Sequence, residues 1–215
     1  MTGTGVLPAW VVPPLAEIED VFWMARAARE SSTESVRIEA RGAAVTWVLG
    51  GGAAPVTGRA EMPVTWGLAS AELWAALLVC DRGCCPRLPG EELCAAWGVR
   101  YVPPVVGVSL AVGDGVARAL GWLLGSPGLE EPPLRLPRRD GDGRVLTAEE
   151  LYADALAHSP QRFRSQEARL ELSRWAQDEA GFSAAAAEWI EVTKQRAARG
   201  RTHPGSLGPP LRCES

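Results

Sequence analysis

The sequence has little of the chemistry on which most catalytic sites depend. Among 215 residues, histidine occurs twice, as His158 and His203, and lysine once, as Lys194. A Ser–His or Cys–His pair would have to use His158, because His203 lies in a Gly/Pro-rich tail. The acidic pairs are neighbours in the sequence, and neighbouring side chains point apart instead of forming a catalytic dyad. We therefore expect a protein that is not an enzyme.

A strong net charge and a long apolar run are also missing. The formal net charge is −4, so the whole molecule does not attract nucleic acid or an anionic membrane. The first residues have no secretory signal pattern, and Asp114 and Arg118 interrupt the most apolar span, where a membrane helix needs about 20 apolar residues. We expect a cytoplasmic protein without disulfides. Arginine almost completely replaces lysine, which is typical of a high-GC bacterium.

The soft, redox-active side chains are concentrated in one stretch, which contains Cys80, Cys84, Cys85 and Cys94. Four thiolates are able to close a structural zinc site or to hold an iron–sulfur cluster, although we expect no cofactor. The spacing argues against zinc, because two of the cysteines are adjacent and no second C-x2-C pair is present. A redox-responsive thiol is another reading, since nearby arginines lower a thiol pKa. The simplest reading is that Cys80 and Cys94 pack as small buried side chains.

The spacing of apolar residues along the sequence predicts an α+β fold, with a mixed or antiparallel sheet and packed helices, followed by a small helical C-terminal region. Apolar residues from Leu15 to about Arg29 follow one helical face. Alternation over 36–40 and again over 45–49 predicts two strands that Gly42 connects. Helices over about 70–79 and 91–97 come next, and the spans 99–102 and 105–112 are read as strands. Asp114 is expected to cap the helix that follows.

The composition also divides the chain into segments. They are an extended Pro-rich arm over 1–14, an α+β core domain over 15–126, a Pro/Gly-rich connector over 127–144, a helical region over 145–199 and a disordered tail over 200–215. In the helical region, Thr147 and Glu150 form a capping box. Helices over about 165–179 and 183–199 are separated by a turn at Gly181, a spacing that resembles a DNA-binding helix-turn-helix.

Two Asp/Gly motifs suggest ligand sites that their surroundings exclude. The segment 140–145 resembles part of an EF-hand loop, but a cation, Arg138, stands where the first carboxylate ligand belongs. The segment Gly113-Asp114-Gly115 matches the start of a dinucleotide fingerprint, but Arg118 occupies the position of a required small residue. We expect neither a calcium site nor a nucleotide site.

Tryptophan, with nine copies, is the residue that most suggests a binding surface. Most of the tryptophans occupy positions that suit a core. Trp10, with Val11 and Val12, lies in the Pro-rich arm, where burial by local structure is difficult. Because aromatic anchors are enriched at interfaces, these three residues are candidates for contact with a partner protein or a second copy.

The sequence thus predicts a cytoplasmic regulatory, adaptor or assembly protein that acts through protein–protein contacts. Two alternatives stay open. One is a thiol-redox or metal-binding protein centred on the segment from Cys80 to Cys94. The other is a DNA-binding regulator that uses the C-terminal helices, although the second of these offers few side chains that read bases.

Overall fold

The computed structural model describes residues 7–29, 35–80 and 90–201. Within these residues the protein consists of helices, and the only strand-like pairing in the described part is a single bridge between Arg139 and Val145. The predicted α+β fold with a sheet is therefore wrong. The helices are α1 (Leu15–Arg29), α2 (Ser35–Val48), α3 (Trp66–Cys80), α4 (Gly90–Ala96), α5 (Leu110–Leu124), α6 (Ala148–His158) and α7 (Gln166–Arg201).

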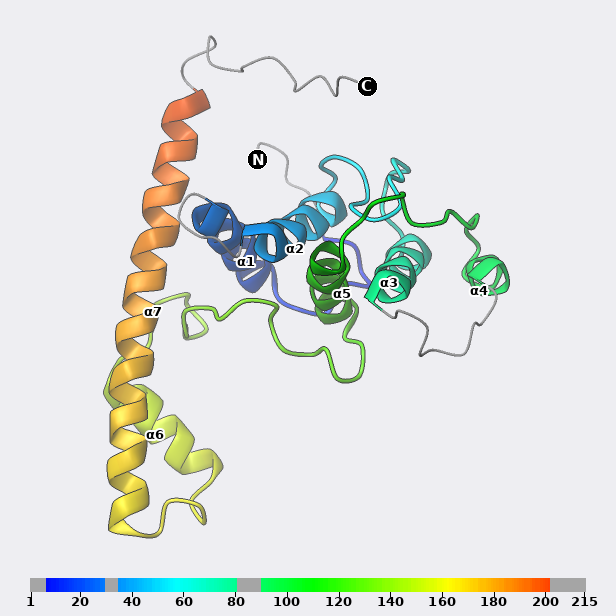
Figure 1. Ribbon diagram of the computed structural model, residues 1–215. Coiled ribbons are helices and arrows are strands. Elements are labelled where there is room, and N and C mark those ends of the chain that lie inside the picture. Colours follow the sequence, from blue (N-terminus) through cyan, green and yellow to red (C-terminus); the bar gives the residue numbers. More distant parts are fainter. Residues whose placement is uncertain (1–6, 30–34, 81–89, 202–215) are drawn as a thin grey trace.

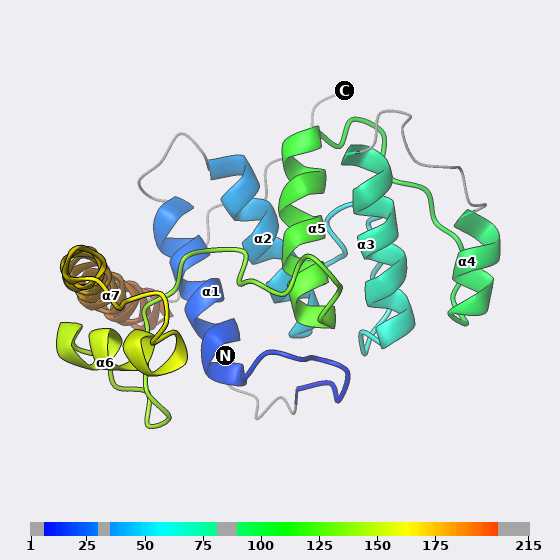
Figure 2. The same cartoon turned by 90° about the horizontal axis from the view of Figure 1, so that it is seen from below.

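Four of the helices form the body of the molecule. Helices α1, α2, α5 and α3 lie side by side in this order, and α4 stands beyond α3 (Figure 1; Figure 2). At the opposite edge, α7 runs past α1 and pairs with α6 (Figure 1). The main core lies between α1, α2, α3 and α5, and its largest fully buried side chain is that of Trp47.

The strands predicted over 36–40 and 45–49 are one continuous helix, α2. Its buried positions are Ala40, Ala44, Val45, Trp47 and Val48. Positions spaced by three, four and eight residues share one face of a helix, so this longer period outweighs the short alternation that suggested strands. Gly42 does not form a turn. A Cβ at Gly42 would stand 2.9 Å from the Cβ of Ala25, so the glycine lets α1 and α2 cross closely.

The strand predicted over 105–112 is also wrong, and so is the predicted cap at Asp114. Val105 and Val106 are exposed in a loop, and α5 begins after Ser109, whose hydroxyl accepts a hydrogen bond from the Val112 amide. Asp114 lies inside α5, where it pairs with Arg118 one turn later. The glycines beside Asp114 face neighbouring helices, Gly113 toward α3 and Gly115 toward α2.

A buried carboxylate, Glu72 on α3, holds the loop between α2 and α3. Its Oε1 accepts hydrogen bonds from the amides of Val56 (2.6 Å) and Thr57 (3.2 Å), and its Oε2 accepts one from the Thr57 hydroxyl (2.5 Å). In the same loop, Arg59 is buried and donates to the carbonyl of Arg100. These bonds tie the loop before α3 to the segment that follows α4.

The C-terminal region contains one long helix where a helix-turn-helix was expected. Helix α7 runs through Gly181 without a break, so the predicted turn is absent. Its buried positions repeat at alternating spacings of four and three residues, and they are Leu172, Ala176, Glu179, Ser183, Ala186, Ile190 and Thr193. Such a stripe requires one uninterrupted helix to stay on one face. The packing of this stripe thus outweighs the low helix propensity of a single glycine.

An arginine-rich connector attaches α7 to the body. Arg139 donates to the buried carboxylate of Asp20 on α1, with 2.8 Å between Nε and Oδ2. Arg135 and Arg138 both pair with the buried carboxylate of Glu179 on α7. A small apolar cluster of Met24, Ala186 and Ile190 joins α1 and α7 directly. The connector therefore links the two helices through charge, and the cluster links them through apolar contact.

Replacing Glu72 by alanine should destabilise the protein strongly. The substitution leaves the Val56 and Thr57 donors buried without an acceptor and removes the carboxylate beside Arg59, which costs about 3–5 kcal/mol of unfolding free energy. Glu72→Gln keeps an acceptor oxygen and should cost less than about 1.5 kcal/mol. Urea unfolding at pH 7 measures both, with exposed Glu188→Ala as the control. Equal losses for the alanine and glutamine variants would contradict this role.

The stability contributed by Glu72 should also depend on pH. Burial raises the pKa of Glu72 above 4.5, although hydrogen bonds from Thr57 and Val56 and the charge of Arg59 lower it in part. Between 4.5 and the raised pKa the folded state binds the proton more tightly, so the unfolding free energy falls as pH rises. As pH rises through this window, the unfolding free energy of the wild type should therefore fall relative to that of Glu72→Gln. If the two unfolding free energies differ by a constant amount from pH 4 to 8, Glu72 does not make stability depend on pH in this way.

Candidate functional site

The sequence-predicted cysteine site is not assembled in the described part of the chain. Cys80 and Cys94 are free thiols on different helices, and Cys84 and Cys85 lie outside the described residues. Among the described residues, no group of three His, Cys, Asp or Glu side chains could hold a metal ion. The expected cysteine cluster is therefore not found there, and Cys94 instead lies beside the cation of Arg59, a poor neighbour for a metal.

The two described thiols are also poorly suited to redox chemistry. Burial raises the pKa of Cys80, and the nearby Asp114 carboxylate raises it further. Burial likewise raises the pKa of Cys94, more than the charge and hydrogen bond of Arg59 lower it. Because the thiolate is the reactive form, a raised pKa makes both thiols less reactive at neutral pH.

The remaining polar candidates from the sequence, His158 and the Asp/Gly segment 140–145, make local hydrogen bonds at a helix end and in a turn. His158 is exposed in the last turn of α6, with Nδ1 2.9 Å from the Asp154 carbonyl oxygen. The capping box of Thr147 and Glu150 is confirmed, and Arg144 and Thr147 hold the pKa of Glu150 at about 2. Asp140 accepts from the amides of Asp142 and Arg144, so the Asp/Gly segment forms a turn that leads into α6.

The N-terminal arm packs on the chain's own core. The indole nitrogen of Trp10 donates to the carbonyl of Val64 at 3.2 Å, and both Trp10 and Val11 pack against the core. Val12 is held by a backbone hydrogen bond to Leu123, but its side chain is 67% exposed. Of the three predicted contact residues, Val12 is thus the one that presents an apolar side chain to solvent.

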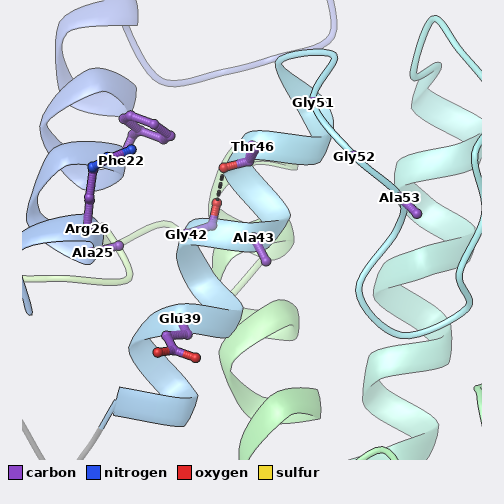
Figure 3. A pocket seen from close by; sticks show the side chains of 10 residues that line it. All are labelled: Phe22, Ala25, Arg26, Glu39, Gly42, Ala43, Thr46, Gly51, Gly52 and Ala53. Atoms are coloured by element: carbon purple, nitrogen blue, oxygen red, sulfur yellow. Dashed lines mark hydrogen bonds between the residues drawn. The ribbon is translucent and has the colours of Figure 1, made fainter. Parts of the chain in front are cut away.

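A groove of about 400 Å³ lies where α1, α2 and the Gly51–Ala53 loop meet (Figure 3). Phe22 and Arg26 line it from α1, and Glu39 and Thr46 line it from α2. The hydroxyl of Thr46 donates to the Gly42 carbonyl at 2.7 Å within the same helix (Figure 3). The groove thus offers two opposite charges and few free polar groups, a weak basis for a specific ligand site.

A second groove, of about 370 Å³, has a more distinctive composition. It lies on the face of α3 toward α4 and the end of α5, and ten residues line it, including Trp66, Trp74 and Trp97. None of the ten carries a charge, and the only side-chain hydroxyls are those of Ser70 and Ser126. We call it the aromatic groove. Its lining can make extensive apolar contact with a ligand but few polar contacts.

The exposed Trp66 and the half-buried Trp97 dominate the aromatic groove. The rings of Trp66 and Trp97 pack edge to face, with 6.3 Å between their centroids and 87° between their planes. Trp66 is 48% exposed, and Leu77 on the same helix is 39% exposed. Water covers a large part of these side chains in the isolated chain, so covering them would release apolar surface from water.

The backbone around the aromatic groove fixes the positions of its walls. A Cβ at Gly67 would stand only 2.4 Å from the Trp97 carbonyl oxygen, so the start of α3 touches the chain just after α4. At the other end, Gly125 ends α5 in a left-handed conformation (φ 64°) and lies against Val12. The exposed Val12 thus extends the apolar surface of the aromatic groove.

Sequence reasoning missed this groove. From the sequence, most of the tryptophans are expected in the core, and Trp66 is not singled out. The walls come from segments that are distant in the sequence, so no local spacing indicates that they meet. The signal that was present is the large number of tryptophans in a chain with few other aromatic residues.

Comparison with known proteins does not assign the chain to a family. No family model, curated protein or solved structure matches it. Among the described residues, none of the helices is both long and apolar enough to cross a membrane. The aromatic groove and the surfaces of the helices are therefore the features that bear on function.

Proposed function

We propose that the protein is a non-enzymatic adaptor or assembly component that binds an apolar, uncharged segment of a partner protein in the aromatic groove. The observation that carries this proposal is the edge-to-face pair of the exposed Trp66 and the half-buried Trp97 in a lining without charge. Tryptophan is enriched among the side chains that contribute most to protein–protein binding.

The chemistry of the lining favours a protein segment over other occupants. Small-molecule sites combine apolar walls with a few convergent polar groups that orient the ligand, and the side-chain polar groups of this groove are two hydroxyls and three indole N–H groups, none of them charged. A nucleic acid requires cations against its phosphates, and none line the groove. An apolar segment requires only area and shape, which the indole rings and Leu77 provide.

The surroundings of the groove support a role as a preformed receptor. Its wall on α3 packs closely on α5 at Gly113, and its wall at Trp97 is fixed by the contact with Gly67. A surface that is held in place before binding loses less conformational entropy when a partner docks. The same lining has no acidic or basic side chain that could activate its two serine hydroxyls, which favours binding over catalysis.

Removal of the two indoles should abolish binding of apolar peptides. We expect a displayed library of random 12-residue peptides, selected on the full chain, to yield uncharged apolar sequences. A synthetic peptide from this selection should bind Trp66→Ala or Trp97→Ala at least about 30-fold more weakly, because a dominant interface tryptophan contributes about 2 kcal/mol or more. Isothermal titration calorimetry measures the affinities.

Trp175→Ala is the matched control for this experiment. Trp175 is 42% exposed on α7, far from the aromatic groove, so its loss should leave peptide affinity unchanged. Thermal melts followed by circular dichroism show whether each variant is folded. Peptides that bind the Trp66→Ala/Trp97→Ala double variant as tightly as the wild type would rule the groove out as the binding site.

A further inference from the structure

Helix α7 carries a second regular stripe beside the one that it buries. Its positions repeat at alternating spacings of three and four residues: Trp175, Asp178, Phe182, Ala185, Trp189 and Val192. We call these residues the α7 seam. A 3.5-residue repeat on a single helix is the pattern by which two helices pack along their length. The buried stripe of α7 has its own partners in α1, α6 and the connector, whereas the seam borders solvent, with Trp175 at one end lining a hollow beside the last turn of α6.

The seam presents apolar surface to solvent. Trp175 is 42% exposed and Trp189 is 37% exposed, and Ala185 between them is also exposed. Phe182 and Val192 are half-buried, and the guanidinium of Arg135 stacks on the Phe182 ring at 3.9 Å from its centroid. Helix α7 lies at the edge of the molecule, with α1 and α6 beside it (Figure 1; Figure 2), so a long partner can approach it from outside.

Charge is distributed unevenly along α7. Before residue 194 the helix has six acidic residues and two arginines, whereas from Lys194 to Arg201 it has four basic residues and no acidic one. The spacing of the seam continues to Glu171 at one end and to Arg196 at the other. Apart from Asp178, the α7 seam is thus apolar from Trp175 to Val192, and its spacing continues to a carboxylate at one end and a guanidinium at the other.

We propose that two copies of this chain associate through an antiparallel pairing of their α7 seams. In this arrangement the two-fold axis passes between Ser183 and Ala184, and Glu171 of each copy lies opposite Arg196 of the other. Trp175 then lies opposite Val192, and Phe182 opposite Ala185, so each large ring faces a smaller side chain. The indole N–H of Trp189 meets the Asp178 carboxylate of the second copy.

The charges select this direction over the parallel one. A parallel pair in register would place Glu171 against Glu171, Asp178 against Asp178 and Arg196 against Arg196, and like charges across an interface oppose association. The antiparallel pair replaces each of these repulsions with an attraction. It also sets the two helix dipoles in opposite directions, which brings the basic end of one α7 next to the more acidic end of the other.

A charge-swap series on the full chain tests the pairing. Sedimentation velocity should show a wild-type dimer whose dissociation constant increases with salt, because ion pairs at the ends of an interface are screened. Glu171→Arg and Arg196→Glu each create like-charge contacts, and each should raise the dissociation constant at least about tenfold. The double variant Glu171→Arg/Arg196→Glu restores opposite charges between copies and should return the constant to near the wild-type value.

The rescue distinguishes association between copies from effects within one copy. Residues 171 and 196 are about 38 Å apart along the same helix, so they cannot compensate for each other within a single chain. Glu92→Arg and Arg100→Glu make the same charge changes at exposed positions in and after α4, at the opposite edge of the molecule from α7, and should leave the dimer intact. Circular dichroism confirms folding of each variant.

Three results would overturn the proposal. One is a wild-type chain that stays monomeric up to about 100 µM, which means a dissociation constant well above that concentration. Another is a dimer that neither single seam variant weakens. The third is a dimer that both single variants weaken but the double variant does not restore. None of these results bears on peptide binding in the aromatic groove, which lies on the other side of the body.

Discussion

The close approach of α5 to its two neighbours is the constraint on which the rest of the structure depends. A Cβ at Gly115 would stand 2.5 Å from the Arg37 carbonyl oxygen of α2, and one at Gly113 would stand 2.8 Å from a methyl carbon of Val79 on α3. Both crossings therefore require glycine. A side chain at either position would push a helix away from α5 and open the core that contains Trp47.

The aromatic groove depends on this packing at one wall and on buried polar groups at the other. The wall on α3 is set by its contact with α5, whereas the wall at Trp97 directly follows the short helix α4, which makes few direct contacts with the body. Glu72 and Arg59 connect these parts, because one holds the loop before α3 and the other binds the backbone after α4. Burial of two charged residues is costly, and here it positions the walls of the aromatic groove.

Sequence reasoning worked best where a local signal determines the structure. The helix from Leu15 to Arg29 and the capping box at Thr147 are both present, because an amphipathic face and a capping pair are read within a few residues. It failed where glycine had a tertiary role. Gly42 and Gly181 were read as turns, but one lies in a helix crossing and the other inside a long helix whose buried stripe continues past it.

The surfaces were harder to predict than the helices for a related reason. The aromatic groove combines Trp66 with Trp97, and the backbone contact that joins them is not visible in the sequence. The α7 seam was hidden by a single error, since the expected turn at Gly181 divides the repeat into two short pieces. Once α7 is continuous, the spacing from Trp175 to Trp189 can be read directly from the sequence.

Helix α7 is attached to α1 over a short part of its length, so a small rotation at this contact moves its far end by a few ångströms. Its direct apolar contact with α1 is confined to a few side chains around Ala186 and Ile190, while the helix continues for about 30 Å toward its N-terminal end. A rotation of about 5° around this contact would move that end by roughly 2–3 Å, and α6 would travel with it. The ion pairs of the connector lie at a distance from the contact around Ala186 and Ile190. Each of them therefore opposes rotation of α7 more strongly than an ion pair at the contact itself would. A partner that competes for Asp20 or Glu179 would thus change the angle between α1 and the pair formed by α6 and α7.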